Sequence, residues 1–395
     1  MADLEGAASR ELGSREVQVG EICGVIAKGD KLIRKKSVLG AVAVTGLCLT
    51  ILSAPSLGLV IYVDDDAPFG GDGSSWQKAY RYLQDALVYL AEGDEIRVAQ
   101  GRYMPHLYGG SPPRAYGREF RIYDRTDQRE MRFEARSSVV LKGGYAGRDA
   151  PDPNVRDVSL YETILTGDLW DNDIWTDDPY GADVVQMLTD NSRRIMVVDE
   201  AGEASIDRFI ITGAAFGVSI DETVAIVRDC TLIRNSGDGR ASGIGLTCSR
   251  SDVTVLACRF EANTGKSRGK GINSYASDVT VKDSVFVGNC SDRGSGAGIY
   301  CDKHGGIYSL HVEGCLFQEN GCGEGLDLEH GSGGAIHTLG YEVVVRDCQF
   351  LGNSAEMGGS IKLRKWPDSA LPVRGQSEQI VVRRTAVRNG DGGGY

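Results

Sequence analysis

The segment from residue 168 to residue 183 carries the side chains best suited to bind a metal ion. Its oxygen-bearing residues are Asp168, Asp171, Asn172, Asp173, Asp177, Asp178 and Asp183. Calcium takes six to eight oxygen ligands, so this segment is a candidate calcium site, with Asp168, Asp171 and Asp173 as its first ligands. The alternative is a solvated insertion, because Trp170 occupies the third position from Asp168 and the D-x-[DN]-x-[DN]-G register is missing. The sequence indicates no other cofactor.

Three aromatic side chains crowd the same segment, namely Trp170, Trp175 and Tyr180. Aromatic rings combine a broad apolar face with a polar edge, and sugar-binding surfaces use such rings. The three residues are therefore candidate ligands for a polysaccharide. The alternative is that they fold back onto the body of the protein.

The sequence identifies no catalytic residue. Hydrolysis of a glycosidic bond needs two carboxylates that face each other at a defined separation, and the chain offers only the Asp177–Asp178 pair and an isolated His330. The recurring pairs Arg228–Asp229 and Arg346–Asp347 favour solvated ion pairs over a base beside a calcium ligand. The five histidines show no H-E-x-x-H spacing, and His337 is expected to pack or to lie at the surface.

The elements that must position these residues are repeats. Five copies of one ten-residue pattern read IVRDCTLIRN from 226, TVLACRFEAN from 254, TVKDSVFVGN from 280, HVEGCLFQEN from 311 and VVRDCQFLGN from 344. Fainter copies begin at Ser205 and Val381. The step between copies runs from about 21 to about 37 residues, which is the spacing of a solenoid.

Three columns of the pattern have predicted roles. The thiol column contains Cys230, Cys258, Cys315 and Cys348, with Ser284 and Thr385 at the same position. The interior column contains Leu232, Phe260, Phe286, Phe317 and Phe350. The turn column contains Asn235, Asn263, Asn289, Asn320 and Asn353. Since Ser and Thr cannot form half of a disulfide, we expect the cysteines of this column to be buried free thiols. We expect the phenylalanines to stack in the interior. The asparagine amides should form a ladder that hydrogen-bonds the backbone of the turns.

The repeats predict an all-β fold. A second short strand with a leading glycine follows each copy, as in GIGLT from Gly243 and GAIHT from Gly334, and no room remains for a crossover helix. Such strands coil as a single-stranded parallel β-helix with coils about 4.8 Å apart, right-handed like nearly all parallel crossovers. Cys290 and Cys322 follow the turn asparagines of neighbouring copies, and a disulfide between them is left open.

Three stretches carry a family resemblance: IYVDDDAPFGGDGSSWQKAYRYLQDALVYLAEGDEIRVAQGRYMP from Ile61, VVLKGGYAGRDAPDPNVRDVSLYETILTGDLWDND from Val139, and NSRRIMVVDEAGEASIDRFIITGAA from Asn191. Over about residues 61–395 the chain resembles exported bacterial right-handed parallel β-helix proteins of the chlamydial polymorphic outer-membrane-like repeat group. The resemblance implies an N-terminal cap that contains a strand, a short helix at about Trp76–Ala91 and a strand at Glu95–Ala99. The helix would cover the unpaired edge of the first coil. Family members end in surface anchors or sorting domains, and this sequence contains neither.

A basic cluster and an uncharged run suggest export. Residues 1–36 form a polar tail with a basic cluster at Lys31–Lys36, and residues 37–58 contain the uncharged run and small residues of a secretory signal. The alternatives are an uncleaved membrane anchor and a buried core helix. The polar residues 1–30 suggest a start codon assigned too early. We expect an extracellular, cell-surface or outer-membrane location, with membrane contact only through residues 37–58 if these are uncleaved.

The remaining sequence divides into a cap with the first coil at 61–110 and further coils at 111–395. The last copy reads VVRRTAVRNGDGGGY and stops at Tyr395 within the expected second strand, so we expect a C-terminally truncated chain that self-associates through its open coil. The net charge of -12 argues against a nucleic-acid partner.

Two functions fit these observations. The first is a non-enzymatic exported or cell-surface scaffold for adhesion or glycan binding, with a polysaccharide or another surface protein as partner. The alternative is a polysaccharide lyase or glycoside hydrolase that acts on an acidic polysaccharide.

Overall fold

The chain divides into two compact units, Met1–Ser53 and Ala54–Tyr395, and the computed structural model describes residues of the second. The described residues are 58–105, 128–173, 190–236, 245–265, 268–291, 295–303, 306, 308–322, 332–355, 359–364, 380–383 and 386–388. The run predicted as a signal or anchor lies outside these residues, apart from Gly58. Among the helices that the structure does describe, none has the length and apolar character needed to cross a membrane.

The described strands form parallel sheets of 16, 9 and 3 strands. One arm of the largest sheet contains β4 (Phe133–Ala135), β7 (Arg194–Asp207), β9 (Phe216–Arg228), β11 (Leu246–Ser249), β15 (Ile272–Tyr275), β19 (Ile299–Asp302), β23 (Ile336–Leu339) and β26 (Ile361–Arg364). The other arm continues β7 and β9 and adds β1 (Val60–Val63), β2 (Glu95–Ala99), β5 (Val139–Tyr145), β12 (Asp252–Leu256), β16 (Asp278–Lys282), β20 (Ser309–Glu313), β24 (Glu342–Arg346) and β27 (Ile380–Arg383).

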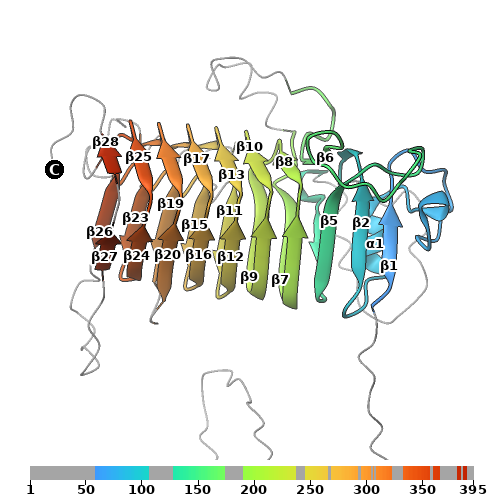
Figure 1. Cartoon of the computed structure of the whole chain (residues 1–395), viewed down its shortest axis with the longest axis horizontal. Coiled ribbons are helices and arrows are strands. Elements are labelled where there is room, and N and C mark those ends of the chain that lie inside the picture. Colours follow the sequence, from blue (N-terminus) through green and yellow to red (C-terminus); the bar gives the residue numbers. More distant parts are fainter. Residues whose placement is uncertain are drawn as a thin grey trace, which may run out of the picture. The chain divides into compact units, whose positions relative to one another are not determined.

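The nine-stranded sheet contains β3 (Gly101–Tyr103), β6 (Thr163–Thr166), β8 (Ile210–Thr212), β10 (Thr231–Ile233), β13 (Arg259–Glu261), β17 (Val285–Val287), β21 (Leu316–Gln318), β25 (Gln349–Leu351) and β28 (Ala386–Arg388). The smallest sheet contains β14 (Thr264–Gly265), β18 (Cys290–Ser291) and β22 (Gly321–Cys322). Neighbours in each sheet belong to successive coils, as the stacked arrows of Figure 1 show. This is the predicted parallel β-helix.

The N-terminal helix is shorter than the sequence predicted. A 3₁₀ turn, η1 (Trp76–Lys78), and the α-helix α1 (Leu83–Val88) replace the single helix expected at 76–91, and a second 3₁₀ turn, η2, spans Gln128–Glu130. The helix is interrupted because Tyr80 pairs with β1: its N–H donates to the Tyr62 carbonyl and its carbonyl accepts from the Asp64 N–H, both at 2.9 Å. Tyr80 thereby closes part of the edge of the first strand, and α1 packs against β1 and β4.

The interior column is a stack of aromatic rings. Phe260, Phe286, Phe317 and Phe350 are each 0% exposed and occupy equivalent positions in four successive strands. Their ring centroids are 4.7, 4.6 and 4.8 Å apart, with interplanar angles of 4°, 6° and 2°. Leu232 extends the column below Phe260. The coil spacing of a parallel sheet therefore sets the ring spacing.

The asparagine column forms a continuous ladder. Each Nδ2 of Asn235, Asn263, Asn289 and Asn320 donates to the Oδ1 of the next asparagine at 2.8–3.1 Å. The same Nδ2 also donates to a main-chain carbonyl of the preceding coil, as from Asn289 to Phe260 at 2.9 Å. The next Oδ1 accepts a main-chain N–H as well, as from Asn289 to Asn320 at 3.2 Å. Each buried amide therefore satisfies backbone groups at the turn.

The thiol column lies on a short corner. Cys230, Cys258, Cys315 and Cys348 are free and at most 2% exposed. Each Sγ lies within hydrogen-bond distance of the carbonyl two residues earlier, as for Cys315 with Glu313 at 3.2 Å, and Ser284 Oγ makes the same bond to Lys282 at 2.7 Å. Thr385 lies outside the described residues. The register places Cys290 beside Gly321, and Cys322 beside Ser291, so the two cysteines are one position out of step.

The two kinds of corner differ in length. In the repeat coils, two residues connect the strands at the cysteine corner, as at Ala257–Cys258, Asp283–Ser284, Gly314–Cys315 and Asp347–Cys348. In the coil of β5 and β6, the same corner is a longer connection, residues 146–162. The connection after each ladder asparagine, here called the asparagine corner, spans 236–245, 264–271, 290–298, 321–335 and 354–360. The strands on both sides keep their register. Length therefore varies strongly at the asparagine corner without disturbing the coils.

Candidate functional site

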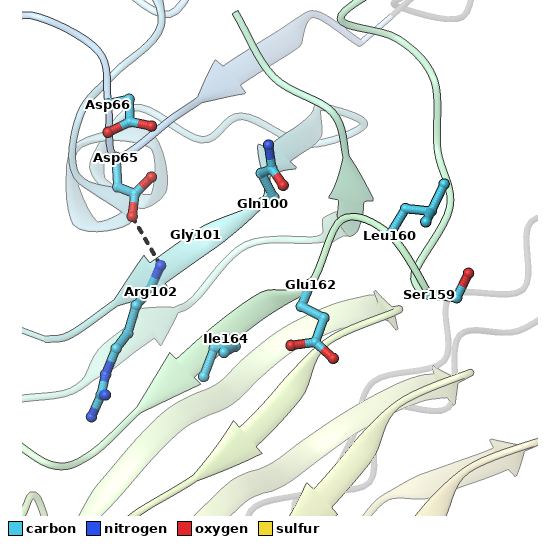
Figure 2. Close-up of a pocket in the computed structure, with 9 residues that line it drawn as sticks. All are labelled: Asp65, Asp66, Gln100, Gly101, Arg102, Ser159, Leu160, Glu162 and Ile164. Atoms are coloured by element: carbon cyan, nitrogen blue, oxygen red, sulfur yellow. Dashed lines mark hydrogen bonds between the residues drawn. The ribbon is translucent and has the colours of Figure 1, made fainter. Parts of the chain in front are cut away.

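A groove of about 510 Å³ lies beside the first coils. Its lining residues, shown in Figure 2, are Asp65, Asp66, Gln100, Gly101, Arg102, Ser159, Leu160, Glu162 and Ile164. They come from the turn after β1, from the junction of β2 and β3, and from the chain that enters β6. The sheets fix these positions: Gly101 N–H donates to the Glu162 carbonyl at 2.9 Å and ties the groove's two sides together.

The turn after β1 is held by its own carboxylates. Asp64 is buried, and its two oxygens accept the N–H groups of Asp66 at 3.1 Å and Arg148 at 2.8 Å. Asp65 Oδ2 accepts the Arg102 N–H at 2.9 Å, the bond drawn in Figure 2. Gly101 has φ of 139°, and a Cβ there would lie 2.2 Å from Asp65 Oδ1, so glycine is required beside this carboxylate.

Three carboxylates converge at this turn. One oxygen from each of Asp64, Asp65 and Asp66 lies within 4.8 Å of the others. Burial raises the pKa of Asp64 and of Asp65, although hydrogen bonds from main-chain N–H groups oppose the shift. Burial also raises the pKa of Tyr103 well above its usual value, and its hydroxyl accepts the Asp65 N–H at 3.2 Å. The groove can therefore accept hydrogen bonds from sugar hydroxyls or hold a cation.

Arg102 connects the groove to the acidic segment that the sequence singled out. Its main-chain N–H faces Asp65, while its guanidinium pairs with Asp168 at 3.0 Å and Asp171 at 2.7 Å. Asp168 is buried, whereas the Asp171 side chain is 67% exposed. Two of the three predicted calcium ligands are therefore neutralised by an arginine.

Asp173, the third predicted ligand, belongs to a different cluster. Its Oδ2 accepts a hydrogen bond from Asn191 Nδ2 at 2.7 Å, and Asn172 Nδ2 donates to Asp190 Oδ2 at 3.0 Å. Burial, and secondarily the carboxylates of Asp168 and Asp190, raise the pKa of Asp173 to about 6. The sequence did not predict Asp190 and Asn191 as members, because residues 174–189 separate them from the rest.

Of the predicted aromatic ligands, Trp170 is 62% exposed on this segment. Trp175 and Tyr180 lie outside the described residues, as do Asp177, Asp178, Asp183 and His330. The structure thus leaves one exposed aromatic side chain beside the carboxylate cluster among the residues it describes here.

One of the recurring Arg-Asp pairs, Arg228–Asp229, contacts the preceding coil. Arg228 pairs with the buried Asp207 of the preceding coil at 2.8 Å and with its neighbour Asp229 at 3.9 Å. Arg156 also reaches Asp207, at 3.0 Å. Hydrogen bonds from the two arginines hold the pKa of Asp207 below its usual value, although burial opposes them. This cluster ties three segments together and leaves Asp207 no free charge for chemistry.

Comparison with protein-family models agrees with this architecture. Residues 189–368 match the family model described as "Right handed beta helix region". Together with the parallel sheets, this match confirms the predicted fold, a right-handed parallel β-helix. No curated protein matches the chain. The crystal structure of Escherichia coli YbhC aligns with a TM-score of 0.32 and 9% sequence identity, over 88% of each chain.

Proposed function

We propose that the protein is a non-enzymatic exported or cell-surface scaffold, and that the connections at its asparagine corner bind a polysaccharide or another surface protein. The observation that carries the proposal is the contrast between corners. Connections of seven residues (354–360) and fifteen residues (321–335) enter equivalent strands, while the cysteine corner keeps two residues in every coil from β7 to β25. A rigid core with variable loops at a fixed edge is a common arrangement for binding surfaces.

The test exchanges loop length at this edge. One variant replaces residues 321–335 with residues 354–360 of the next coil, and a control, Asp347→Gly, changes the cysteine corner at a position with φ of 54°. We expect both proteins to keep the circular dichroism of the parent. Binding to immobilised neutral and acidic polysaccharides, or to whole cells, should fall at least about tenfold only for the loop variant, which is about 1.4 kcal/mol. Unchanged binding after shortening every long connection would contradict the proposal.

Export is the second component of the proposal and is supported by the basic cluster at Lys31–Lys36 and the uncharged run that follows it. The scaffold should be recovered outside the cytoplasm with its N-terminus between about residues 54 and 58, a position that follows from the small residues at the end of the run. N-terminal sequencing of the secreted and membrane fractions measures this. Full-length protein confined to the cytoplasm would count against export.

A glycoside hydrolase is the second candidate, favoured by the groove in which Glu162, Asp66 and Asp65 lie near Arg102 (Figure 2). Glycosidases use two carboxylates on either side of the scissile bond. An acidic lining repels uronate groups, so a neutral polysaccharide suits this groove better than an acidic one. Release of reducing ends that is abolished in both Glu162→Gln and Asp66→Asn would establish this candidate in place of the scaffold.

A further inference from the structure

Three buried oxygen atoms between β6 and β7 have no hydrogen-bond partner: Oδ1 of Asp173, Oδ1 of Asp190 and Oδ1 of Asn191. Asn191 is only 2% exposed, and its side-chain amide faces the Asp173 carboxylate. A buried polar atom without a partner costs free energy, and a buried carboxylate oxygen costs more than a neutral one. Three such atoms in one cluster therefore indicate a missing ligand.

Two side-chain amides of the cluster each donate a hydrogen bond to the Oδ2 atom of one carboxylate. Asn191 Nδ2 occupies Asp173 Oδ2, and Asn172 Nδ2 occupies Asp190 Oδ2. These two bonds join residues that are 18 positions apart, so they hold the two chain segments side by side. Asn172 N–H also donates to Asp168 Oδ1 at 3.1 Å and positions the start of the segment. The arrangement orients one oxygen of each carboxylate and leaves the second without a donor.

The charge of the cluster is also unbalanced. Arg102 pairs with Asp168 and Asp171, on the side of the segment nearer the groove. Among the residues that the structure describes, no lysine or arginine lies within ion-pair distance of Asp173 or Asp190. Within the described residues, Asp173 and Asp190 therefore form no direct ion pair, although Arg102 acts on Asp173 from beyond that distance and Arg129 Nε donates to the Asn191 carbonyl at 3.1 Å.

We propose that Asp173, Asp190 and Asn191 bind a calcium ion through their Oδ1 atoms. Two carboxylate oxygens and one amide oxygen are the hard ligands that calcium prefers, and water can complete its coordination of six to eight oxygens. Magnesium is less suited, because it requires near-ideal octahedral geometry and loses its waters reluctantly. The assignment goes beyond the proposed scaffold function. It replaces Asp168 and Asp171, which pair with Arg102, with Asp190 and Asn191.

The first experiment measures binding to the intact chain. After treatment with EDTA and removal of the chelator, calcium should raise the melting temperature by about 4 °C at a hundredfold excess over Kd. Isothermal titration with calcium should give a saturable heat with a stoichiometry near one. Terbium, which substitutes for calcium, should show luminescence on excitation of tryptophan, with Trp170 three residues from Asp173. Magnesium should give a much smaller shift.

The second experiment tests whether calcium binding depends on these particular ligands or only on the negative charge of the segment. Asp173→Asn and Asp190→Asn each remove one charged ligand and should weaken calcium binding at least about tenfold. Asp171→Asn removes the same charge from the same segment and should leave the affinity within about twofold. Both ligand substitutions relieve carboxylate repulsion, so the metal-free variants should fold, which far-ultraviolet circular dichroism checks. If water alone fills the cluster, the parent protein gives neither a thermal shift nor heat, and the proposal is wrong. Equal losses in all three variants would also overturn it.

Discussion

At the scale of single residues, polar side chains in this protein often serve two coils at once. Thr163 is an example: its hydroxyl donates to the Ala99 carbonyl at 2.9 Å and accepts the Gly144 N–H at 2.8 Å. Asn289 similarly bonds the coil before it and the coil after it. Because each such group is buried with its partners in place, removing one leaves several buried atoms unsatisfied.

His337 predicts how stability depends on pH. Burial lowers its pKa to about 4, and the nearby charges of Arg268, Arg364 and Lys362 act in the same direction. The folded pKa lies below the unfolded value of about 6.5, so unfolded chains take up a proton that folded chains do not. The contribution of neutral, buried His337 to the free energy of unfolding is therefore fully present above about pH 6.5 and is lost as the pH falls toward about 4.

The measurement compares the parent with His337→Gln, which cannot titrate. Between about pH 7.5 and pH 5, the free energy of unfolding of the parent should fall by about 2 kcal/mol more than that of the variant. Urea titrations at several pH values give the difference directly. Equal slopes for the two proteins would show that His337 titrates normally in the folded state.

At the scale of elements, the turns repeat a strained backbone conformation. The residue before each ladder asparagine has positive φ: Arg234 (53°), Ala262 (49°), Gly288 (59°), Glu319 (54°) and Gly352 (61°). Residues with a Cβ are disfavoured in this left-handed region by about 1 kcal/mol or more. Strand pairing and the ladder hydrogen bonds on either side fix the conformation of the turn, so it is kept even where the residue is not glycine.

Exchanging glycine and alanine at these turns should therefore change stability in opposite directions. Ala262→Gly should stabilise the fold by about 1 kcal/mol, since the strain exceeds the extra entropy of unfolded glycine. Gly288→Ala should destabilise it by about the same amount, because a Cβ at Gly288 meets no atom within 4 Å and only the backbone angle is penalised. Chemical denaturation of both variants tests the pair. Shifts of the same sign would refute the explanation.

At the scale of the whole described unit, each coil contacts mainly its two neighbours, so the fold behaves as a one-dimensional stack. The phenylalanine column illustrates this: Phe286 stacks on Phe260 and on Phe317, at 4.7 and 4.6 Å. Local unfolding caused by a substitution in one coil should therefore extend mainly to the two neighbouring coils.

Phe286→Ala should destabilise the protein by about 3–5 kcal/mol, because neighbouring coils cannot close the cavity. Hydrogen exchange should rise in β13, β17 and β21 and stay near the parent level in β1, β2 and β5. The outward-facing Thr280→Ala is the control and should change stability by less than about 0.5 kcal/mol. Uniform loss of protection along the chain would show a single cooperative core instead.

Much of this fold was predictable from the sequence, while most of the candidate site was not. The columns that contain Phe317 and Asn320 recur in register along the chain, so aligned repeats predict aligned neighbours. Asp190 could not be assigned to Asp173 in this way, because their contact depends on how two non-repeating segments meet. The helix at the N-terminus was predicted too long for a related reason: Tyr80 pairs with β1, and tertiary hydrogen bonds override local helical preference.

The asparagine ladder also bears on how such a gene can change. Every coil from Asn235 to Asn353 offers its neighbours the same amide, and most offer the same aromatic face. An in-frame tandem duplication between two asparagine codons would add one coil, and both new junctions would reproduce contacts already present. A deletion between two such codons would likewise rejoin matching surfaces. The number of coils can therefore vary by recombination, while substitutions within the ladder positions are constrained.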